Sequence, residues 1–210
     1  MRSIRVAEDC TRCPDLVANR SCIVHGYGAA GAQVVFIGEA PGYRGGDVTG
    51  VPFTLDRSGV RLQRMLIELG LSEETEPRIE QPRLRCFITN VVRCNPPSNR
   101  TPSRAEAANC QPYLWQELAL IKPQIIVPVG NVAARAIFPH VLNQPAPPIT
   151  KAHAQVFALD GSWVVPMRHP ARVSAQDVRW VVPMRHPARI SNADLARFGE
   201  VLGRLLRQVS

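Results

Sequence analysis

The chain has 210 residues, of which 45% are hydrophobic and 20% charged, which is enough for one domain with a full hydrophobic core. No apolar run approaches the roughly 20 residues that a membrane-spanning helix needs. The segment Met1–Cys10 lacks the apolar stretch of a secretion signal, so we expect a cytoplasmic protein. The formal net charge of +8 favours a polyanionic partner such as nucleic acid, and it is equally compatible with a basic surface that only aids solubility.

The first half of the chain predicts alternating strands and helices. Residues 34–38 are an apolar run that ends in the turn Gly38-Glu-Ala-Pro-Gly42, which predicts a buried strand. Residues 58–70 place their apolar side chains largely along one helical face, with Ser58 as the N-cap. Residues 86–92 predict a second strand.

The next helix is expected to open with Thr101 as its N-cap and Pro102 as its first residue. Pro112 is expected to kink or divide this helix, because proline lacks an amide hydrogen and clashes with the preceding turn. Residues 124–129 then predict a third buried strand, followed by a short helix at 131–137.

Near the C-terminus, residues 154–159 and 163–167 flank Asp160-Gly161, a strong signal for a β-hairpin. The tail, at 192–209, has apolar residues at helical spacing. Alternation of strands and helices predicts an α/β fold with a mostly parallel sheet. Because sites in such folds form at the carboxyl ends of strands, the loops after Gly38, Val92 and Met167 are the places to look.

One segment is duplicated. Residues 163–172 recur identically at 180–189, 17 residues later. This period is shorter than that of solenoid repeats, so we interpret it as a local tandem duplication. Only one copy can occupy a given strand-to-loop position. The hairpin leads directly into the first copy, which favours it, whereas the second copy runs straight into the final helix.

The six cysteines lie at positions 10, 13, 22, 86, 94 and 110. In a reducing cytosol, spaced cysteines are more typical of metal ligands or reactive thiols than of disulfides. The pair Cys10-x2-Cys13 can present two thiolates to one metal centre, and Cys94 and Cys110 can complete a four-sulfur site for zinc or a [4Fe–4S] cluster. Unrelated core or redox cysteines are the alternative. We expect no metal role for Cys86, in a predicted strand, or for Cys22, which could substitute as a ligand.

These cysteines belong to a longer series of motifs: Cys10-x2-Cys13, Gly38-Glu-Ala-Pro-Gly42, Gly50-Val-Pro-Phe53, Thr89-Asn-Val-Val-Arg-Cys94, Cys110 and a His-Pro loop. In this order and spacing the series resembles the iron–sulfur uracil-DNA glycosylases of families four and five. The match extends from Cys10 to about residue 189, which is most of the chain.

The resemblance implies a three-layer α/β/α sandwich formed by one domain, residues 1–210, whose N-terminal segment 1–32 contributes to the cluster. It implies a structural [4Fe–4S] cluster held by Cys10, Cys13, Cys94 and Cys110. It also implies a monomeric hydrolase of DNA repair that removes uracil, and conceivably other deaminated bases, from DNA.

The chain departs from the family pattern at several positions. Where family four usually has an acidic pair after its glycine-rich motif, residues 43–47 keep only Asp47. Residues 45–59 look closer to family five, and Ala171 stands where serine is frequent. The range of bases and the preference for single- or double-stranded DNA therefore stay open.

Excision of uracil requires an everted base to be read while negative charge builds on it. Phe53 would stack on the base, and the Asn90 amide would pair with O4 and N3–H of uracil. The backbone N–H groups of the loop containing Gly38, Ala40 and Gly42 would approach the base closely. Without the resemblance, a core phenylalanine and a capping asparagine would be the ordinary interpretations.

The resemblance gives His169 the role of donor to uracil O2, with His186 in the second copy as the alternate. Better-known glycosylases place a water-activating Asp or Asn where Ala40 stands. We therefore expect Glu39 or Asp47 to position the water, with Glu39 favoured, unless stabilisation of the leaving group suffices.

Arginines near these loops are candidates for a clamp on DNA phosphates. Arg93, Arg100 and Arg104 flank the cysteine loop, and Arg168 and Arg172 flank His169. Two rival functions remain at this stage. One is a non-catalytic iron–sulfur or zinc protein for electron transfer or nucleic-acid binding, and the other is a glycosylase-like fold that binds DNA without cutting it.

Overall fold

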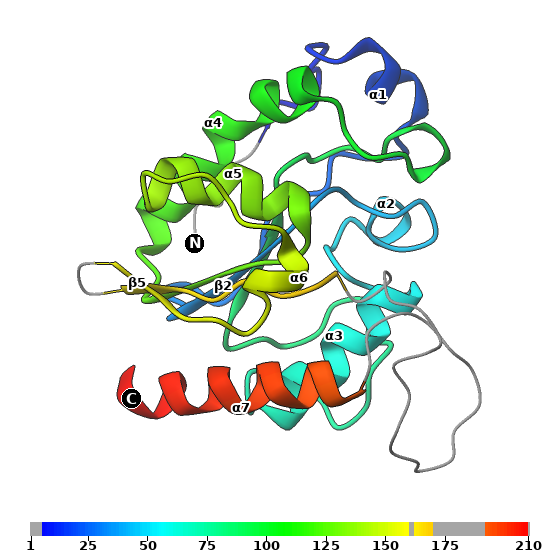
Figure 1. The fold of residues 1–210 in the computed structure, drawn as a ribbon. Coiled ribbons are helices and arrows are strands. Elements are labelled where there is room, and N and C mark those ends of the chain that lie inside the picture. Colours follow the sequence, from blue (N-terminus) through cyan, green and yellow to red (C-terminus); the bar gives the residue numbers. More distant parts are fainter. Residues whose placement is uncertain (1–5, 160–161, 170–191, 210) are drawn as a thin grey trace.

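The computed structural model describes residues 6–159, 162–169 and 192–209. Three layers are visible in Figure 1: helices α4 and α5 cover one face of a central sheet, and α3 and α7 cover the other. The predicted α/β/α sandwich is therefore confirmed. The helices are α1 (Pro14–Asn19), α2 (Gly46–Thr49), α3 (Arg57–Glu68), the 3₁₀ turn η1 (Pro97–Asn99), α4 (Arg104–Ile121), α5 (Asn131–Val141), α6 (Ile149–Ala152) and α7 (Asn192–Val209).

The sheet is mixed, with a parallel centre. Its strands follow the order β1-β3-β2-β4-β6-β5, in which β3, β2, β4 and β6 are parallel neighbours and the two edge strands are antiparallel. Gly38 at the end of β2 pairs with Asn90 at the end of β3, so the loops that follow these strands start side by side. The strands are β1 (Tyr27–Gly28), β2 (Val34–Gly38), β3 (Phe87–Asn90), β4 (Ile125–Pro128), β5 (Phe157–Leu159) and β6 (Ser162–Val164).

Alternation along β2 divides the core in two. Val34 and Phe36 face the cluster formed with α3 and α7, whereas Val35 and Ile37 face the cluster formed with α4 and α5. All four side chains are buried, as expected for a central parallel strand covered on both faces. The apolar run at 34–38 thus gives both the strand and its central position.

Two predicted helix starts were wrong by two residues, because a better cap lay nearby. Asp56, rather than Ser58, caps α3, and its side chain accepts a hydrogen bond from the Gly59 N–H at 2.8 Å. Ser103, rather than Thr101, caps α4 through a capping box with Glu106. In the box, the Ser103 hydroxyl accepts from the Glu106 N–H at 3.2 Å, and the Glu106 carboxylate accepts from the Ser103 N–H at 2.7 Å.

Prolines interrupt the helices less than the sequence indicated. Helix α4 continues through Pro112 to Ile121, and α5 continues through Pro139 to Val141, four residues beyond the predicted end. In α4 the buried side chains of Cys110 and Leu114 lie on both sides of Pro112. Packing of this face onto the sheet offsets the missing backbone hydrogen bond.

The C-terminal elements agree with prediction. Strands β5 and β6 pair as an antiparallel hairpin, although Asp160-Gly161 itself lies outside the described residues. Helix α7 spans the predicted 192–209. The short elements α1, β1, α2, η1 and α6 were not predicted, because two to six residues carry too little periodicity. Within the described ranges, no helix is both long and apolar enough to cross a membrane.

Candidate active site

A cavity of about 540 Å³ opens at the carboxyl ends of the parallel strands. Two of the three predicted loops, those after β2 and β3, supply most of its wall, and the third supplies His169. Phe53, Asp56 and Ser58, around the start of α3, complete the wall. The lining consists of Glu39, Ala40, Pro41, Gly42, Tyr43, Arg44, Phe53, Asp56, Ser58, Asn90, Pro96, Asn99, Arg100 and His169.

Asn90 presents an unpaired amide to this cavity. The residue is 1% exposed, and neither its Nδ2 nor its Oδ1 has a hydrogen-bond partner among the described residues. A buried amide left without partners costs roughly 1–3 kcal/mol, so such a group indicates a site where a ligand supplies them. The side chain offers a donor and an acceptor next to each other, a pattern that matches an adjacent acceptor and N–H on a planar ring.

Phe53, Gly38 and Asn90 pack tightly around the inner end of the cavity. A Cβ atom placed on Gly38 would collide with the Asn90 Oδ1 atom and with the Phe53 ring, so only glycine fits there. Phe53 has a positive φ of 54°, a strained conformation for this residue type. Gln63 in α3 donates from Nε2 to the Phe53 carbonyl at 3.4 Å and supports the turn. Strain of this kind is characteristic of functional sites.

Backbone pairing with β4 places His169 at the cavity. The Met167 N–H donates to the Pro128 carbonyl at 2.8 Å, and the Gly130 N–H donates to the Met167 carbonyl at 2.8 Å. His169 then lies with its ring centroid 6.1 Å from that of Phe53. A Cβ atom on Gly130 would come within 3.3 Å of the His169 Cβ, so a side chain there would press on the histidine.

A buried histidine also supports this loop. The Arg168 N–H donates to His153 Nδ1 at 3.3 Å, one residue before His169. His153 is buried, and its ring stacks on Phe198 of α7 at a centroid distance of 6.0 Å. The first copy of the duplicated segment is therefore held at the cavity by the chain at the end of β4 and by His153. His186 and Arg172 lie outside the described residues.

Two acidic residues line the cavity. Glu39, predicted from the sequence, is half-buried at its rim. Asp56 was not predicted; burial raises the pKa of its carboxyl, and hydrogen bonds from the Gly59 and Ser58 amides lower it in part. Side chains at Gly42 or Gly45 would collide with the Asp56 carboxylate, so the glycine-rich loop folds closely over it.

Asp47 lies elsewhere, which corrects its predicted catalytic role. It is 3% exposed and is not among the residues lining the cavity. Its two carboxylate oxygens accept from the Ser21 N–H at 3.1 and 3.2 Å. Asp47 therefore ties α2 to the N-terminal segment.

Arg93 is also misassigned by the sequence, since it cannot contact DNA. It is 1% exposed, and its Nη2 lies 2.6 Å from a carboxylate oxygen of Glu117 in α4. Thr89 completes this buried network by donating to the same oxygen at 2.7 Å and contacting the Arg93 guanidinium. An isolated buried charge is very costly, so this pair fastens β3 and the chain after it to α4.

A second, narrow cavity is lined by Cys10, Cys13, Cys94 and Cys110 together. The sequence thus identified four thiols, 100 residues apart at the extremes, that the fold brings to one place. Among the residues that the structure describes, no three His, Cys, Asp or Glu side chains are close enough to hold a single metal ion.

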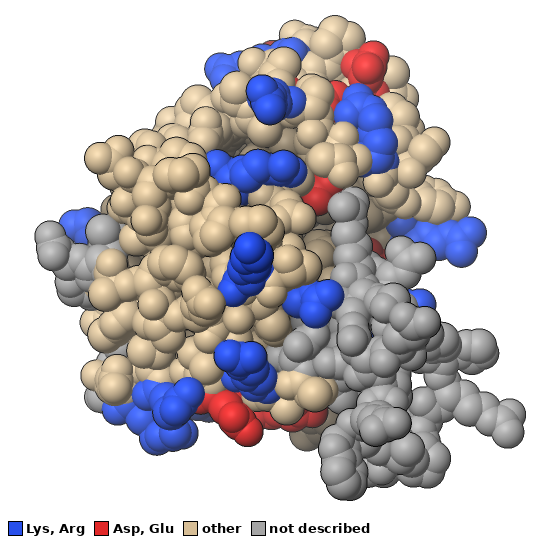
Figure 2. Space-filling view, viewed as in Figure 1, with Lys and Arg blue, Asp and Glu red and all other residues tan. Residues whose placement is uncertain are grey.

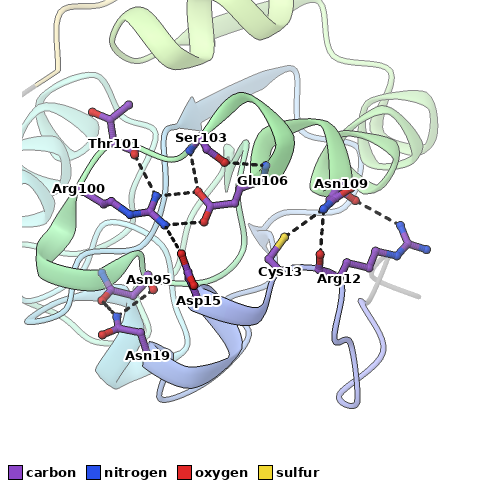
Figure 3. A network of polar contacts seen from close by, with 10 residues as sticks. All are labelled: Arg12, Cys13, Asp15, Asn19, Asn95, Arg100, Thr101, Ser103, Glu106 and Asn109. Atoms are coloured by element: carbon purple, nitrogen blue, oxygen red, sulfur yellow. Dashed lines mark hydrogen bonds and ion pairs between the residues drawn. The ribbon is translucent and has the colours of Figure 1, made fainter.

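N–H donors surround these sulfurs. Arg20 donates to Cys94 Sγ at 3.4 Å and to the Cys10 carbonyl at 3.1 Å. Asn109 donates to Cys13 Sγ at 3.4 Å and to the Arg12 carbonyl at 3.0 Å, as Figure 3 shows. Burial raises the pKa of the Cys94 thiol, and the hydrogen bond from Arg20 lowers it in part.

The other two cysteines lie outside this cavity, as predicted. Cys86 is fully buried, and burial raises the pKa of its thiol to about 12, so it behaves as a core residue. Cys22 is half-buried and donates from its thiol to the Asp47 carbonyl at 3.4 Å. All six cysteines are free of disulfides.

The remaining predicted arginines differ in their surroundings. Arg100 lines the active-site cavity, where its guanidinium bonds both carboxylate oxygens of Glu106, at 2.7 and 2.8 Å. Arg104 is exposed at the start of α4, and Arg168 is half-buried beside His169. On the face drawn in Figure 2, Lys and Arg side chains are spread over several separate places.

Several residues of the site gave no usable signal in the sequence. Ser58 was predicted only as a helix cap, Asp56 was given no role, and Asn99 lies in a short turn without periodicity. Tyr43 is 54% exposed at the rim of the cavity. A large exposed aromatic in a glycine-rich loop is the one signal that could have pointed to it.

The fold and the site define a class. This is a three-layer α/β protein with a cavity lined by Phe53 and Asn90 at the ends of its parallel strands, and with a pocket of four thiols. The family model described as the uracil DNA glycosylase superfamily matches residues 25–207. The chain therefore belongs to the uracil-DNA glycosylase superfamily.

Curated relatives carry two type names. The chain is 34% identical to a type-4 uracil-DNA glycosylase of Archaeoglobus fulgidus, over 81% of this chain and 80% of the relative. It is 36% identical to a type-4 uracil-DNA glycosylase of Thermotoga maritima, over 77% of this chain and 76% of the relative. It is also 36% identical to a type-5 uracil-DNA glycosylase of Pyrobaculum aerophilum, over 61% of this chain and 65% of the relative.

Proposed function

We propose that this protein is a DNA glycosylase that hydrolyses the N-glycosidic bond of uracil in DNA and so begins base excision repair. The observation that carries the proposal is the Asn90 amide, which is buried, unpaired on both sides and placed at a cavity with Phe53 and His169. Membership of the superfamily and the names of the relatives support the same activity.

Base selection follows from the chemistry of Asn90. Its Nδ2 donates to O4 of uracil, and its Oδ1 accepts from N3–H. Cytosine presents the reverse pattern at these positions, so it would leave the buried amide mispaired. Such a mismatch costs roughly 1–3 kcal/mol for each unsatisfied group. Phe53 adds stacking against the everted base, worth roughly 1–3 kcal/mol.

Bond breakage is driven from the base side. As the bond between the sugar C1′ and the base nitrogen breaks, the electron pair moves onto the base, and His169 donates a hydrogen bond to uracil O2 where charge builds. The oxygen of a water molecule then bonds to C1′, and the water gives up a proton to a general base on the protein or to solvent. Glu39 is our choice to position this water. Asp56 is the other acid on the cavity, whereas Asp47 is excluded by its position.

The contact surface for DNA is proposed to extend from the cavity along α3. Arg57 and Arg64 are exposed on this helix, with Arg61 between them. Positions 57, 61 and 64 lie along one face of the helix, and burial, followed by the positive charges of Arg57 and Arg64, lowers the pKa of Arg61. Arg57 also stands in the first turn, where the helix dipole disfavours a cation. A phosphate backbone would relieve both conflicts.

The proposed phosphate contacts also include Arg100, Arg104, Arg168 and Arg172, the last of which lies outside the described residues. Arg100 contributes in a second way, since it holds the cavity rim to α4 through Glu106. Uracil-containing DNA is thus the partner we propose. Action as a monomer and location in the cytoplasm stay predictions, as does acceptance of other deaminated bases.

We also propose a [4Fe–4S] cluster at the four-cysteine pocket. The donor set fits, because four thiols line one cavity and N–H groups aim at two of them. A cluster takes one thiolate at each of its four irons, so it needs all four of these cysteines. When bound, the cluster would serve to fix the N-terminal segment to the loop after β3.

The decisive experiment is incubation with a labelled oligonucleotide that contains one uracil, followed by alkali to cleave abasic sites. We expect strand cleavage at uracil and none at cytosine in the same position. Substrates that contain hypoxanthine or xanthine test which other bases are released. If no base is released from any of these substrates at any salt concentration, the enzymatic proposal is wrong, and a non-catalytic DNA-binding role takes its place.

A further inference from the structure

The four-cysteine pocket and the active-site cavity are joined by one buried side chain, that of Asn95. It is 2% exposed and follows Cys94 directly in the chain. Its Nδ2 donates to the Pro41 carbonyl and to Asn99 Oδ1, both at 2.8 Å. Asn19 donates from Nδ2 to Asn95 Oδ1 at 2.9 Å and to the Asn95 carbonyl at 3.1 Å. Both hydrogens of the Asn95 amide are therefore used.

Each end of this arrangement reaches a different site. Asn19 is the last residue of α1, the short helix whose N-cap is the cysteine ligand candidate Cys13. At the other end, Asn99 Oδ1 accepts from the Tyr43 N–H at 2.9 Å, and Pro41, Tyr43 and Asn99 all line the active-site cavity. We call Asn19, Asn95 and Asn99 the asparagine bridge.

The bridge controls the direction of a peptide group. Because the peptide between Pro41 and Gly42 is planar and trans, fixing the Pro41 carbonyl also fixes the direction of the Gly42 N–H. Gly42 belongs to the loop whose backbone approaches the bound base under the proposed function. A loop that contains two glycines and lacks this tether would sample several orientations.

A second tether runs parallel to the first. Arg100, on the cavity, lies 3.5 Å from the Asp15 carboxylate in α1 and bonds Glu106 in α4. Figure 3 shows both tethers leaving α1, one through Asn19 to Asn95 and the other through Asp15 to Arg100. The Asp15 side chain is 77% exposed, so its ion pair with Arg100 is screened by solvent and the buried Asn95 tether is the stronger of the two.

We propose that Asn95 is a positioning residue that makes the geometry of the base cavity depend on the four-cysteine pocket. Its function is to transmit the fixed position of Cys94 and α1 to residues 41–43. The proposal rests on the proposed function only in identifying the cavity as the base site. The coupling itself is a property of the fold, and it can be measured without DNA.

The first test is hydrogen exchange at the Tyr43 amide, which the bridge protects through Asn99. We expect Asn95→Ala to speed this exchange at least about tenfold, and Asn95→Asp to do the same, because a carboxylate cannot donate to Pro41 or Asn99. The control is Asn109→Ala, which removes a contact to Cys13 Sγ but leaves Asn19, Asn95 and Asn99 in place, so exchange at Tyr43 should be slower in it than in Asn95→Ala. Exchange at Tyr43 that is unchanged in Asn95→Ala overturns the proposal.

The second test is a cycle that measures coupling. Cys13→Ala should speed hydrogen exchange at the Tyr43 amide in the parent protein. In the Asn95→Ala variant it should change the exchange rate little, because the bridge is already broken. Additive effects contradict the coupling. If Cys13→Ala fails to fold, as judged by circular dichroism, Asn19→Ala replaces it, because it removes the same end of the bridge.

Activity supplies the third readout. We expect Asn95→Ala to lower kcat for uracil release about 10- to 100-fold with a melting temperature close to that of Asn109→Ala. Equal activity of the two variants would mean that Asn95 acts only in folding. A parent protein that releases no base refutes the proposed function, whereas the exchange experiments still decide whether the bridge couples the two sites.

Discussion

At the scale of single residues, the site is defined by groups whose ordinary interactions are missing. A protein of this size satisfies nearly all its buried polar atoms, yet both polar atoms of the Asn90 side chain lack a partner in the part of the chain that the structure describes. Gly38, which must be glycine, and Phe53, which has a positive φ, are immediate neighbours of this amide. Two of these three neighbours, Asn90 and Phe53, carry an energetic cost in the fold, and this pattern indicates that the cavity is shaped for a ligand.

Asn90→Ala should therefore separate function from stability. We expect uracil release to fall at least about 100-fold, because the amide recognises the base and holds it during reaction. The melting temperature should stay the same or rise slightly, since an unsatisfied buried group is removed. Excision assays and thermal unfolding measure the two effects. Activity equal to that of the parent would show that Asn90 does not read the base.

His169 gives a second prediction at this scale. His169→Ala should lower the rate of uracil release about 100- to 1,000-fold, the usual effect of removing a donor to a developing oxyanion. His186→Ala should have little effect, because the first copy of the repeat is the one held at the cavity. His140→Ala, which removes only a ring stacked on Trp115, is the control. Equal tolerance of His169→Ala and His186→Ala would remove histidine from the mechanism.

At the scale of elements, helix starts carry more of the site than the sequence suggested. The caps of α3 and α4, Asp56 and Ser103, lie two residues from the predicted ones. Asp56 lines the cavity, and Ser103 shares its partner Glu106 with Arg100, which also lines it. Propensity ranks Ser, Thr and Asp almost equally as caps. Only tertiary contacts, such as that of Glu106 with Arg100, choose between them.

The capping box of α4 should give a pH-dependent contribution to stability. Hydrogen bonds from Arg100, together with those from Ser103, hold the pKa of Glu106 at about 2, below its usual 4.5. Because this folded-state pKa is depressed, the stabilisation is present above about pH 4.5 and is lost as the pH falls toward 2.

Glu106→Gln tests this contribution. We expect it to lower the free energy of unfolding by roughly 1–2 kcal/mol at pH 7 and by progressively less below pH 4.5. Denaturant titrations across this range measure the difference. Glu68→Gln, at the exposed end of α3, should show no such trend. A difference that is constant with pH would mean that the Arg100 pair contributes nothing.

Helix α3 supplies a prediction about DNA affinity. Replacing Arg57 and Arg64 by Gln should weaken binding to an oligonucleotide with an abasic site and reduce the salt slope of log Kd by about two. The control, Arg83→Gln with Arg85→Gln, removes the same charge from residues already paired with Glu73 and Glu74. Equal losses of DNA affinity in both double variants would indicate that net charge alone controls binding and that DNA makes no specific contact along α3.

At the scale of the whole molecule, local patterns and long-range contacts were predictable to different degrees. The apolar run at 34–38 and the helical spacing at 192–209 gave strand β2 and helix α7, because each is long enough for its periodicity to show. Motif order then placed Phe53, Asn90 and His169 around one cavity. The sequence did not predict which charged residues are buried. Arg93 and Asp47 look like ordinary surface residues in the sequence, and only the fold reveals their partners Glu117 and Ser21.

The anchoring of Met167 on β4 explains how the chain tolerates its duplicated segment. Pairing of Met167 with Val129 ends the sheet just before His169, so the second copy adds length only between the anchored histidine and α7. Of the 22 residues that separate His169 from Asn192, one repeat unit accounts for 17. Extending a connection by this amount costs only about 1 kcal/mol, because closure entropy grows with the logarithm of length.

Removal of one repeat unit yields the same shortened sequence whichever copy is deleted. We expect this variant to release uracil within a few-fold of the parent rate and to melt slightly higher. An inactive variant with a native circular dichroism spectrum would show that the second copy contributes to catalysis. Sequence added after an anchored segment does not have to change the anchoring contacts, so such a position gives evolution a place to lengthen the chain without rebuilding the cavity.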